Sequence, residues 1–207
     1  MKPGHLACAA AAAVAFVSFP LAAFAENDSS WMVRARVIGV LPSEDADIVP
    51  IGGDTDIDDA FVPELDFTYF FAKHWAAELI LATAPHEVSH TPTGLDLGEV
   101  WLLPPTLLLQ YHFQPDHQTF RPYLGVGVNY TLFYGVDDPA PLNVEYDNSV
   151  GFALQAGVDF PIGGGWAINA DVKKIFINTD VTIAPLGVSA DVDINPWVVG
   201  VGLGYRY

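Results

Sequence analysis

The chain has 207 residues, which is long for one domain and short for two, so we expect a single domain. It carries 25 Asp and Glu residues against 8 Lys and Arg, a formal net charge of -17, which argues against nucleic acid or anionic phospholipid headgroups as partners. Yet 51% of the residues are hydrophobic and the mean hydropathy is +0.30. This combination is typical of a membrane protein whose charges lie in its loops.

The first 25 residues have the pattern of a secretory signal peptide. Lys2 gives a weak positive start, residues 6–19 form an apolar run interrupted only by Ser18, and the small residues Ala23 and Ala25 precede Glu26. The single cysteine, Cys8, lies inside this segment, so the remaining chain has no disulfide, thiol chemistry or cysteine metal site. We therefore expect a signal peptide at residues 1–25 and one domain at residues 26–207.

After residue 25, no stretch approaches the roughly 20 apolar residues that a membrane-spanning helix needs. Two classes of β protein remain open. A soluble sandwich or calycin-like barrel turns its apolar side chains inward. A transmembrane barrel turns them outward and carries aromatic residues at both membrane interfaces.

Alternation of bulky apolar residues with small or polar ones predicts strands at residues 123–134, 150–160 and 195–207. Less regular segments at residues 31–40, 64–71, 75–84, 101–113 and 166–177 bring the expected number to eight. Strands of about ten residues can cross a bilayer when tilted, whereas soluble strands are usually about five or six residues long. The residues expected to face lipid include Leu124, Val126, Leu154, Val199 and Leu203.

The connections between these segments alternate in length. Those at residues 72–74, 114–119 and 161–165 are short, whereas those at residues 41–63, 85–100, 135–149 and 178–194 are long and hold most of the acidic residues. This predicts an eight-stranded antiparallel transmembrane β-barrel with short periplasmic turns and four longer extracellular loops. The expected aromatic girdles comprise Trp31, Trp75, Trp166, Tyr123 and Tyr207 near the short turns, and Trp101, Tyr134 and Trp197 near the long loops.

Several motifs together resemble the outer membrane protein W family. They are LPPTL at residues 103–107, QYHF at 110–113, RPYLGVG at 121–127, DNS at 147–149 running into Gly151 and Gly157, NPW at 195–197 and GLGYRY at 202–207. The resemblance covers residues 26–207 and implies an eight-stranded barrel of the cell outer membrane, with a hydrophobic interior channel implicated in the passage of small apolar molecules. Tyr207 stands where the family usually has Phe, and this aromatic terminus implies recognition by the barrel-assembly machinery.

Two short motifs are better explained as chance matches. Residues 86–90 read HEVSH, the zinc-protease pattern, but that chemistry needs a helix, and on a strand the two histidines would stand about 13 Å apart. Residues 54–59 resemble the start of a calcium loop, but Asp59 and Leu65 occupy the positions that need Gly and Glu. The acidic stretch at residues 44–66 could still hold divalent cations loosely, although a solvated surface loop is the simpler explanation.

An enzyme is the competing functional class, since some small outer-membrane barrels modify lipid A with a Ser and His pair. Ser89, beside His86 and His90, is the one candidate, and no third residue that would orient such a pair is evident. We therefore expect no catalytic site, no cofactor and no enzymatic activity.

Carrying the alternation through each strand places charged and polar side chains in the periplasmic half of the lumen. Because an isolated charge in a narrow lumen costs several kcal/mol, these groups should pair and form a polar plug. The alternative is packing alone, since side chains can fill the lumen of an eight-stranded barrel. The expected plug residues are Arg34, Arg36, Glu78, Gln110, Asp159, Asp171, Lys173 and Arg206, with His112 and Asn169 nearby.

Higher in the lumen, the inward positions are apolar where a water-filled pore would be polar. The expected channel-lining residues are Ile38, Val40, Leu102, Pro104, Leu108 and Val198. An apolar channel closed below by charge suits small hydrophobic molecules that leave sideways into the membrane, and Pro104, Pro105 and Gly125 mark possible exits. Outer-membrane lipids and lipopolysaccharide are further expected partners. A barrel that only anchors, or that serves as a surface receptor, remains the alternative.

Overall fold

The structure is a computed structural model that describes residues 31–43, 45–49, 54–91, 95–137, 144–183 and 187–207. The expected signal peptide, residues 1–25, lies outside the described residues. Among those that are described, no helix is long and apolar enough to cross a membrane.

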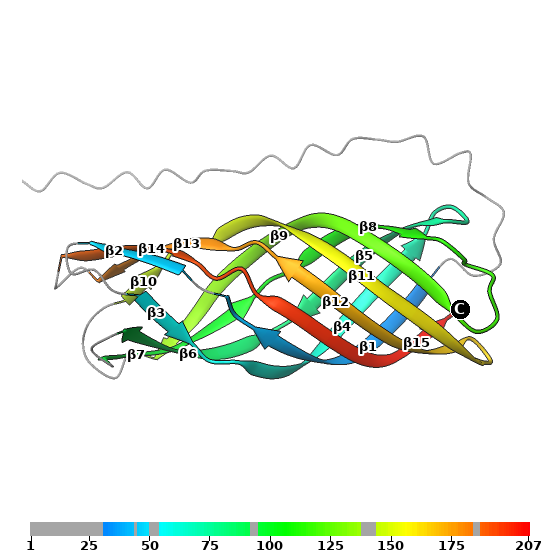
Figure 1. The fold of residues 1–207 in the computed structure, drawn as a ribbon, viewed down its shortest axis with the longest axis horizontal. Coiled ribbons are helices and arrows are strands. Elements are labelled where there is room, and N and C mark those ends of the chain that lie inside the picture. Colours follow the sequence, from blue (N-terminus) through cyan, green and yellow to red (C-terminus); the bar gives the residue numbers. More distant parts are fainter. Residues whose placement is uncertain (1–30, 44, 50–53, 92–94, 138–143, 184–186) are drawn as a thin grey trace, which may run out of the picture.

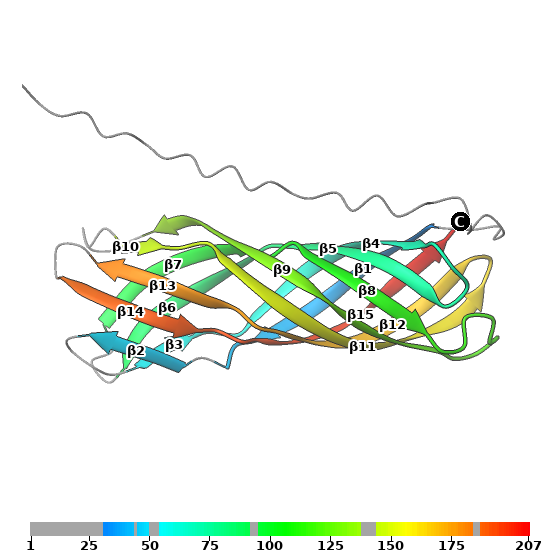
Figure 2. The ribbon, with the colours of Figure 1, turned by 90° about the horizontal axis from the view of Figure 1, so that it is seen from above.

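Eight antiparallel strands close into a barrel, as the alternation predicts (Figures 1 and 2). Each strand pairs with two neighbours, and the pairing of β9 with β11 completes the ring. The barrel strands are β1 (Trp31–Leu41), β4 (Ala60–Phe70), β5 (Trp75–Ala82), β8 (Thr106–His112), β9 (Arg121–Asp137), β11 (Ser149–Gly163), β12 (Trp166–Ile175) and β15 (Trp197–Arg206).

Strands β1 and β15 pair with each other and form a seam of the barrel. Trp31 N donates to the carbonyl of Tyr207 at 3.4 Å, and Tyr207 N donates to the carbonyl of Trp31 at 3.0 Å. In Figure 1 the C-terminus lies at the same end of the barrel as the short turns. This is the periplasmic end in the topology that the loop lengths predict.

The long connections fold into further strands, which the sequence analysis treated as loops. The strands β7 (Leu95–Leu103), β6 (Ala84–Thr91) and β3 (Asp54–Ile57) extend the barrel sheet beyond β9. A second sheet has the order β10 (Val144–Tyr146), β13 (Asn178–Ile183), β14 (Val188–Asp193) and β2 (Asp45–Val49). Along its strands, exposed polar residues alternate with buried apolar ones such as Val181 and Val192. One face of this sheet therefore packs over an apolar interior.

The segment expected as one strand at residues 101–113 is two strands, β7 and β8, separated by Pro104 and Pro105. Both strands pair with β9, but the two prolines have no N–H to donate to a ladder. Their carbonyls are satisfied instead by β9, with Asn129 Nδ2 donating to Pro104 at 3.3 Å and Tyr130 N donating to Pro105 at 3.1 Å.

The outward face of the barrel is apolar. Leu124, Val126, Leu154, Val199 and Leu203 are 47–53% exposed, so the soluble alternative, which buries them, is wrong. The same alternation buries the charged side chains of β1, β4, β5, β11 and β12 inside. The barrel therefore has the inverted pattern of a protein whose solvent is lipid.

Aromatic residues lie at both ends of this apolar band. Trp31, Trp75, Trp166 and Tyr207 are exposed near the short turns, and Tyr134 and Trp197 are exposed near the extracellular sheets. Tyr123, which was expected in the periplasmic girdle, is an exception: its position on β9 turns it inward, and it is 1% exposed.

Close approach of two strands at Gly127 gives a test of the barrel geometry. A Cβ at this position would lie 1.9 Å from the carbonyl oxygen of Leu107. This backbone atom cannot move away without displacing strand β8. Gly127→Ala should therefore destabilise the barrel by at least about 1–3 kcal/mol, measured as urea unfolding in detergent micelles. In the control Gly39→Ala, the new Cβ meets the Phe61 ring at 3.1 Å, and a ring at the lipid surface can move. Equal stability of the two variants would contradict the close approach of β8 and β9 at this position.

Candidate functional site

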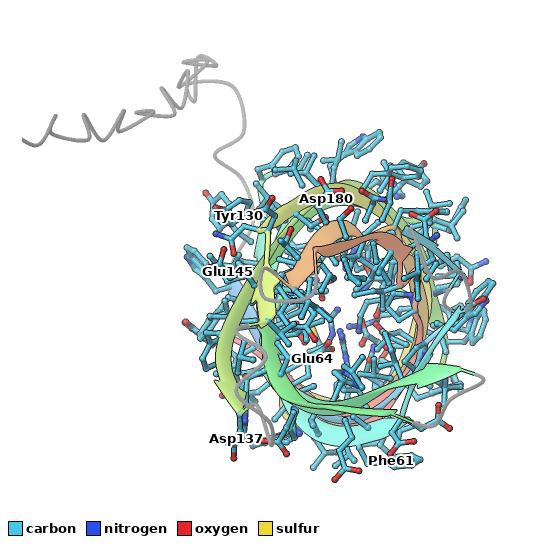
Figure 3. All side chains as sticks on the ribbon, turned by 90° about the vertical axis from the view of Figure 1, so that its left-hand side faces the viewer. Phe61, Glu64, Tyr130, Asp137, Glu145 and Asp180 are labelled. Atoms are coloured by element: carbon cyan, nitrogen blue, oxygen red, sulfur yellow. The ribbon has the colours of Figure 1, made fainter. Side chains whose placement is uncertain are left out.

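The lumen has two levels of opposite character, set by which residue types occupy the inward positions of each strand. The level nearer the periplasm is lined by charged and amide side chains, and the level above it is lined by apolar ones. Figure 3 looks in from the extracellular end and shows Glu64 inside the ring of strands, whereas Phe61 and Tyr130 point outward.

Arg34 is the centre of the lower level and is fully buried. Its Nε and Nη2 donate to the two carboxylate oxygens of Asp159 at 3.1 and 2.9 Å, a bidentate pair. Its Nη1 reaches Thr68 Oγ1 at 2.7 Å, Glu78 Oε1 at 3.1 Å and Asp66 Oδ1 at 3.3 Å. One guanidinium group therefore joins strands β1, β4, β5 and β11 across the lumen.

Arg36 makes a second set of contacts one step toward the cell exterior. Its Nε donates to Asn169 Oδ1 at 2.8 Å, and its Nη1 donates to Glu64 Oε1 at 2.7 Å. Its Nη2 donates to Glu78 Oε1 at 3.1 Å, the oxygen that Arg34 also contacts. The carboxylate of Glu78 thus bridges the two guanidinium groups.

Lys173 closes the lower level from the side of β12. Its Nζ lies 2.8 Å from Glu64 Oε1 and 3.1 Å from Asp171 Oδ2, and all three side chains are buried. Asp171 Oδ2 also lies 3.0 Å from Arg36 Nη1. Each cation is therefore held by at least two carboxylates, as charges in a site with little water require.

Amide side chains satisfy the remaining carboxylate oxygens. Gln110 and Gln155 both donate to Glu78 Oε2, at 2.7 and 2.9 Å, and Gln110 also donates to Gln155 Oε1 at 2.8 Å. Asn169 Nδ2 donates to Asp159 Oδ1 at 2.8 Å and to the Tyr123 hydroxyl at 3.0 Å. This extensive pairing leaves few polar atoms in the network without a partner.

Seven of the eight expected plug residues therefore meet in this network, and the eighth, Arg206, lies on its periplasmic side, in a cavity that Asp159 also lines. The Arg206 guanidinium carbon stands 3.9 Å above the Phe70 ring, and the side chain lines this cavity of about 540 Å³ between the network and the periplasm. We call this cavity the vestibule. It also contacts His112, Arg121 and Asp159.

Five further side chains contact this network and were not among the expected plug residues: Glu64, Asp66, Thr68, Tyr123 and Gln155. The signal was present in β4, where Glu64, Asp66 and Thr68 alternate with the outward Leu65 and Phe67. The bulk of Tyr123 suggested a membrane interface. Its ring lies instead against Gly157, where a Cβ would stand 2.4 Å from the hydroxyl oxygen.

The upper level is an apolar cavity, which we call the well. Five of the six expected channel-lining residues border it: Ile38, Val40, Leu102, Pro104 and Val198. The sixth, Leu108, is 1% exposed and belongs to the same apolar cluster, between Thr106 of the well and Gln110 of the network. The well has a volume of about 50 Å³, small beside the roughly 300–1,000 Å³ of typical ligand pockets, so a larger guest must displace lining side chains.

His86 lies at the top of the well on β6, outside the eight membrane-spanning strands. Its Nδ1 lies 2.9 Å from the carbonyl oxygen of Asp58. Burial lowers the pKa of His86 below its ordinary value, although the hydrogen bond to Asp58 acts in the opposite direction. A neutral imidazole adds no charge at the top of the well at neutral pH, whereas Glu64 and Lys173 border the well as an ion pair.

The HEVSH segment lies on strand β6 rather than on a helix, so its two histidines are not arranged as zinc-protease ligands. Ser89 lies on the same strand rather than on the loop expected at residues 85–100. Over the part of the chain that the structure describes, no group of three or more His, Cys, Asp or Glu side chains could hold a metal ion. Part of the acidic stretch at residues 44–66 lies outside the described residues.

Removing the central cation tests the network. Arg34→Met should leave Asp66, Glu78 and Asp159 without their shared partner, and we expect a loss of about 3–5 kcal/mol in unfolding free energy. In the control Lys73→Met, an exposed pair with Asp116 at 2.6 Å is removed and little change is expected. Urea unfolding in micelles measures both. A loss no larger in Arg34→Met than in the control would contradict the network as a source of stability.

Comparison with known proteins agrees with this architecture. The chain is 43% identical to the outer-membrane protein y4mB of Sinorhizobium fredii, over 97% of this chain and 91% of that protein. The crystal structure of OprG from Pseudomonas aeruginosa superposes with a TM-score of 0.80 and 30% identity, covering 86% of this chain and 96% of OprG. A dibenzothiophene metabolism operon protein, PahQ of Pseudomonas aeruginosa, is 27% identical over 87% of this chain and 90% of its own length.

Both y4mB and OprG are outer-membrane proteins by name, and the family described as the OmpW family matches residues 27–207. With its closed eight-stranded barrel and its apolar outward face, the chain belongs to the OmpW family of outer-membrane barrels.

Proposed function

We propose that this barrel takes up small hydrophobic molecules at the cell surface and releases them sideways into the outer membrane. The observation that carries the proposal is the position of the well directly above the charged network. A narrow lumen that merely needed filling would not require apolar residues above and charges below.

The well offers a favourable environment for an apolar guest. Its lining consists mostly of aliphatic side chains and prolines, continued upward by the apolar inner faces of the two extracellular sheets. A guest gains roughly 25 cal/mol for each Å² of apolar surface that it removes from water. Small hydrophobic molecules would thus leave the aqueous phase at this level.

The charged network favours release to the side rather than downward. An apolar guest that entered the network would have to break ion pairs such as that of Arg34 with Asp159. It has no polar groups that could replace the lost interactions. The periplasmic vestibule lies beyond this barrier. Continued movement along the barrel axis is therefore unfavourable.

A break in the strand ladder offers a route through the wall. The described pairs of β5 with β8 end at Ile80 with Thr106, and the pairs of β6 with β7 begin at Ala84 with Leu102. The residues between them include Ala82 and Pro104, which line the well. A wall without ladder hydrogen bonds at this level can open at lower cost than a paired one.

The relatives support the same class of cargo. PahQ is named for a dibenzothiophene metabolism operon, and dibenzothiophene is an apolar aromatic compound. The structure supports binding of an apolar guest without identifying it. A barrel that only anchors in the membrane is the competing function, and the small volume of the empty well is the observation that favours it.

Filling the well tests uptake. Ala84 is buried and lines the well, so Ala84→Phe should reduce the uptake of radiolabelled naphthalene to that of cells lacking the protein. Glu87→Phe adds the same side chain to the exposed face of the same strand and should leave uptake unchanged. Both variants are compared at equal amounts of folded protein in the outer membrane. Equal uptake by all strains, including the one lacking the protein, would favour the anchoring function.

Closing the break in the wall tests lateral release separately. The double substitution Pro104→Val and Pro105→Thr supplies two N–H groups and lets β7 continue into β8. Naphthalene uptake by cells should fall several-fold, whereas its binding to the purified variant in micelles should persist. Unchanged uptake would exclude this break as the exit while leaving the well intact as a binding site.

A further inference from the structure

The buried network holds more acidic than basic groups. Its five carboxyl groups face three cations, and even with Arg206 of the vestibule included, the count leaves one negative charge in excess. All eight barrel strands face this space. The carboxyl groups are those of Glu64, Asp66, Glu78, Asp159 and Asp171, the cations are Arg34, Arg36, Lys173 and Arg206, and the other polar side chains are Thr68, Gln110, His112, Tyr123, Gln155 and Asn169.

Groups farther out do not cancel this charge inside the network. Asp116, at the rim of the vestibule, forms an exposed ion pair with Lys73. Arg121 donates its Nε to the carbonyl of His117 in the periplasmic turn. Water at this rim screens both groups, whereas the network is buried.

The carboxyl groups of the network differ in how many donors they receive. Glu78 accepts four hydrogen bonds: two from the guanidinium groups at Oε1 and two from the amides at Oε2. Asp159 accepts three, from Arg34 and Asn169. Four or three donors are what an ionised carboxylate requires when it is removed from water.

Glu64 and Asp171 accept two each, and Asp66 accepts the fewest. Its Oδ1 accepts one long hydrogen bond of 3.3 Å from Arg34. Its Oδ2 is the one buried side-chain nitrogen or oxygen atom without a hydrogen-bond partner among the described residues. Arg36 Nη2 lies 3.1 Å from this Oδ2 as an ion-pair neighbour, but makes its hydrogen bond to Glu78 instead. An ionised oxygen in this position would be poorly compensated.

The Asp66 and Glu78 carboxyl groups lie against the same two guanidinium groups. Arg34 Nη1 lies 3.3 Å from Asp66 Oδ1 and 3.1 Å from Glu78 Oε1. Arg36 Nη2 lies 3.1 Å from both Asp66 Oδ2 and Glu78 Oε1. Two carboxylates this close repel each other unless one of them carries a proton. A proton on Asp66 Oδ2 would give that atom a hydrogen bond to donate, and Glu78 Oε1 would accept it in place of the bond from Arg36 Nη2, which also lies 3.1 Å from Asp66 Oδ2. It would also cancel the excess charge of the lumen.

We propose that Asp66 and Glu78 form a proton-binding site, with a proton resident on Asp66 Oδ2 at neutral pH and hydrogen-bonded to Glu78. With Arg206 of the vestibule included, the proton brings these buried charges to zero, and it links β4 to β5 inside the lumen. This site is independent of the hydrophobic uptake proposed above, since it lies below the well and needs no guest.

A resident proton makes stability depend on pH in a defined direction. An ordinary Asp carboxyl, with a pKa of about 3.9, has lost its proton in the unfolded chain at neutral pH. Unfolding would therefore release about one proton, and the unfolding equilibrium constant should rise about tenfold for each pH unit above neutral until Asp66 ionises.

Infrared spectroscopy and unfolding of the purified barrel in micelles test the site. The wild type should show the carbonyl stretch of a protonated carboxylic acid at neutral pH. Asp66→Asn keeps a donor for Glu78 without the titrating group, so the band and the alkaline dependence of unfolding should both disappear. Asp116→Asn is the control, because Asp116 lies at the exposed rim in an ion pair with Lys73, outside the network, and its change should leave the band and the alkaline dependence in place.

Three results would overturn the proposal: no protonated carboxyl band in the wild type at neutral pH, a band that persists in Asp66→Asn, or the same pH dependence in both proteins. If Asp66→Asn does not fold, the wild type labelled with ¹³C aspartate decides the question. The side-chain carboxyl resonance assigned to Asp66 should then have the shift of a protonated acid at neutral pH and should move only on alkaline titration. A resonance already at the ionised position would refute the site.

Discussion

The narrow lumen of an eight-stranded barrel is the constraint on which the rest of this structure depends. Side chains alone can fill such a lumen, so whatever points inward must pack against the opposite wall. Charged residues placed there lose their water and must find partners across the barrel. Arg34 does so with carboxylates on β4, β5 and β11, and in this way a local requirement for charge compensation fixes how distant strands face one another.

The narrow lumen also explains the apolar well, where the inward side chains are aliphatic instead of charged. Where the inward positions become aliphatic, as at Ile38 and Val198, the lumen has no donors to hold water in place. The two levels thus create a gradient of polarity along one axis, steep enough that a molecule suited to the upper level is excluded from the lower. The extracellular sheets extend the apolar level outward, and they carry their acidic residues on the faces away from it.

Much of this could be predicted from the sequence because a strand has a period of two. Once Arg34 and Arg36 are assigned to the inner face of their strand, the same alternation identifies the inward residues of the other strands. Those inward residues make up both the charged network and the apolar well. Three features needed the structure. Tyr123 has the size of an interface residue, and only its contact with Gly157 shows why it turns inward. The fourth strand was drawn through two prolines whose carbonyls are satisfied by β9. The strands in the extracellular loops have short, polar sequences whose pairing depends on partners far along the chain.

The seam between β1 and β15 bears on how the chain is made. Trp31 and Tyr207 exchange hydrogen bonds in both directions, so the first strand to be synthesised finds its second neighbour only in the last. Until residue 207 is available, the sheet has two open edges, and in lipid an open edge leaves a row of backbone groups unsatisfied. A chain cut short by even one strand would therefore be left as an exposed sheet rather than a smaller barrel. Closure at the seam distinguishes a finished molecule from an incomplete one.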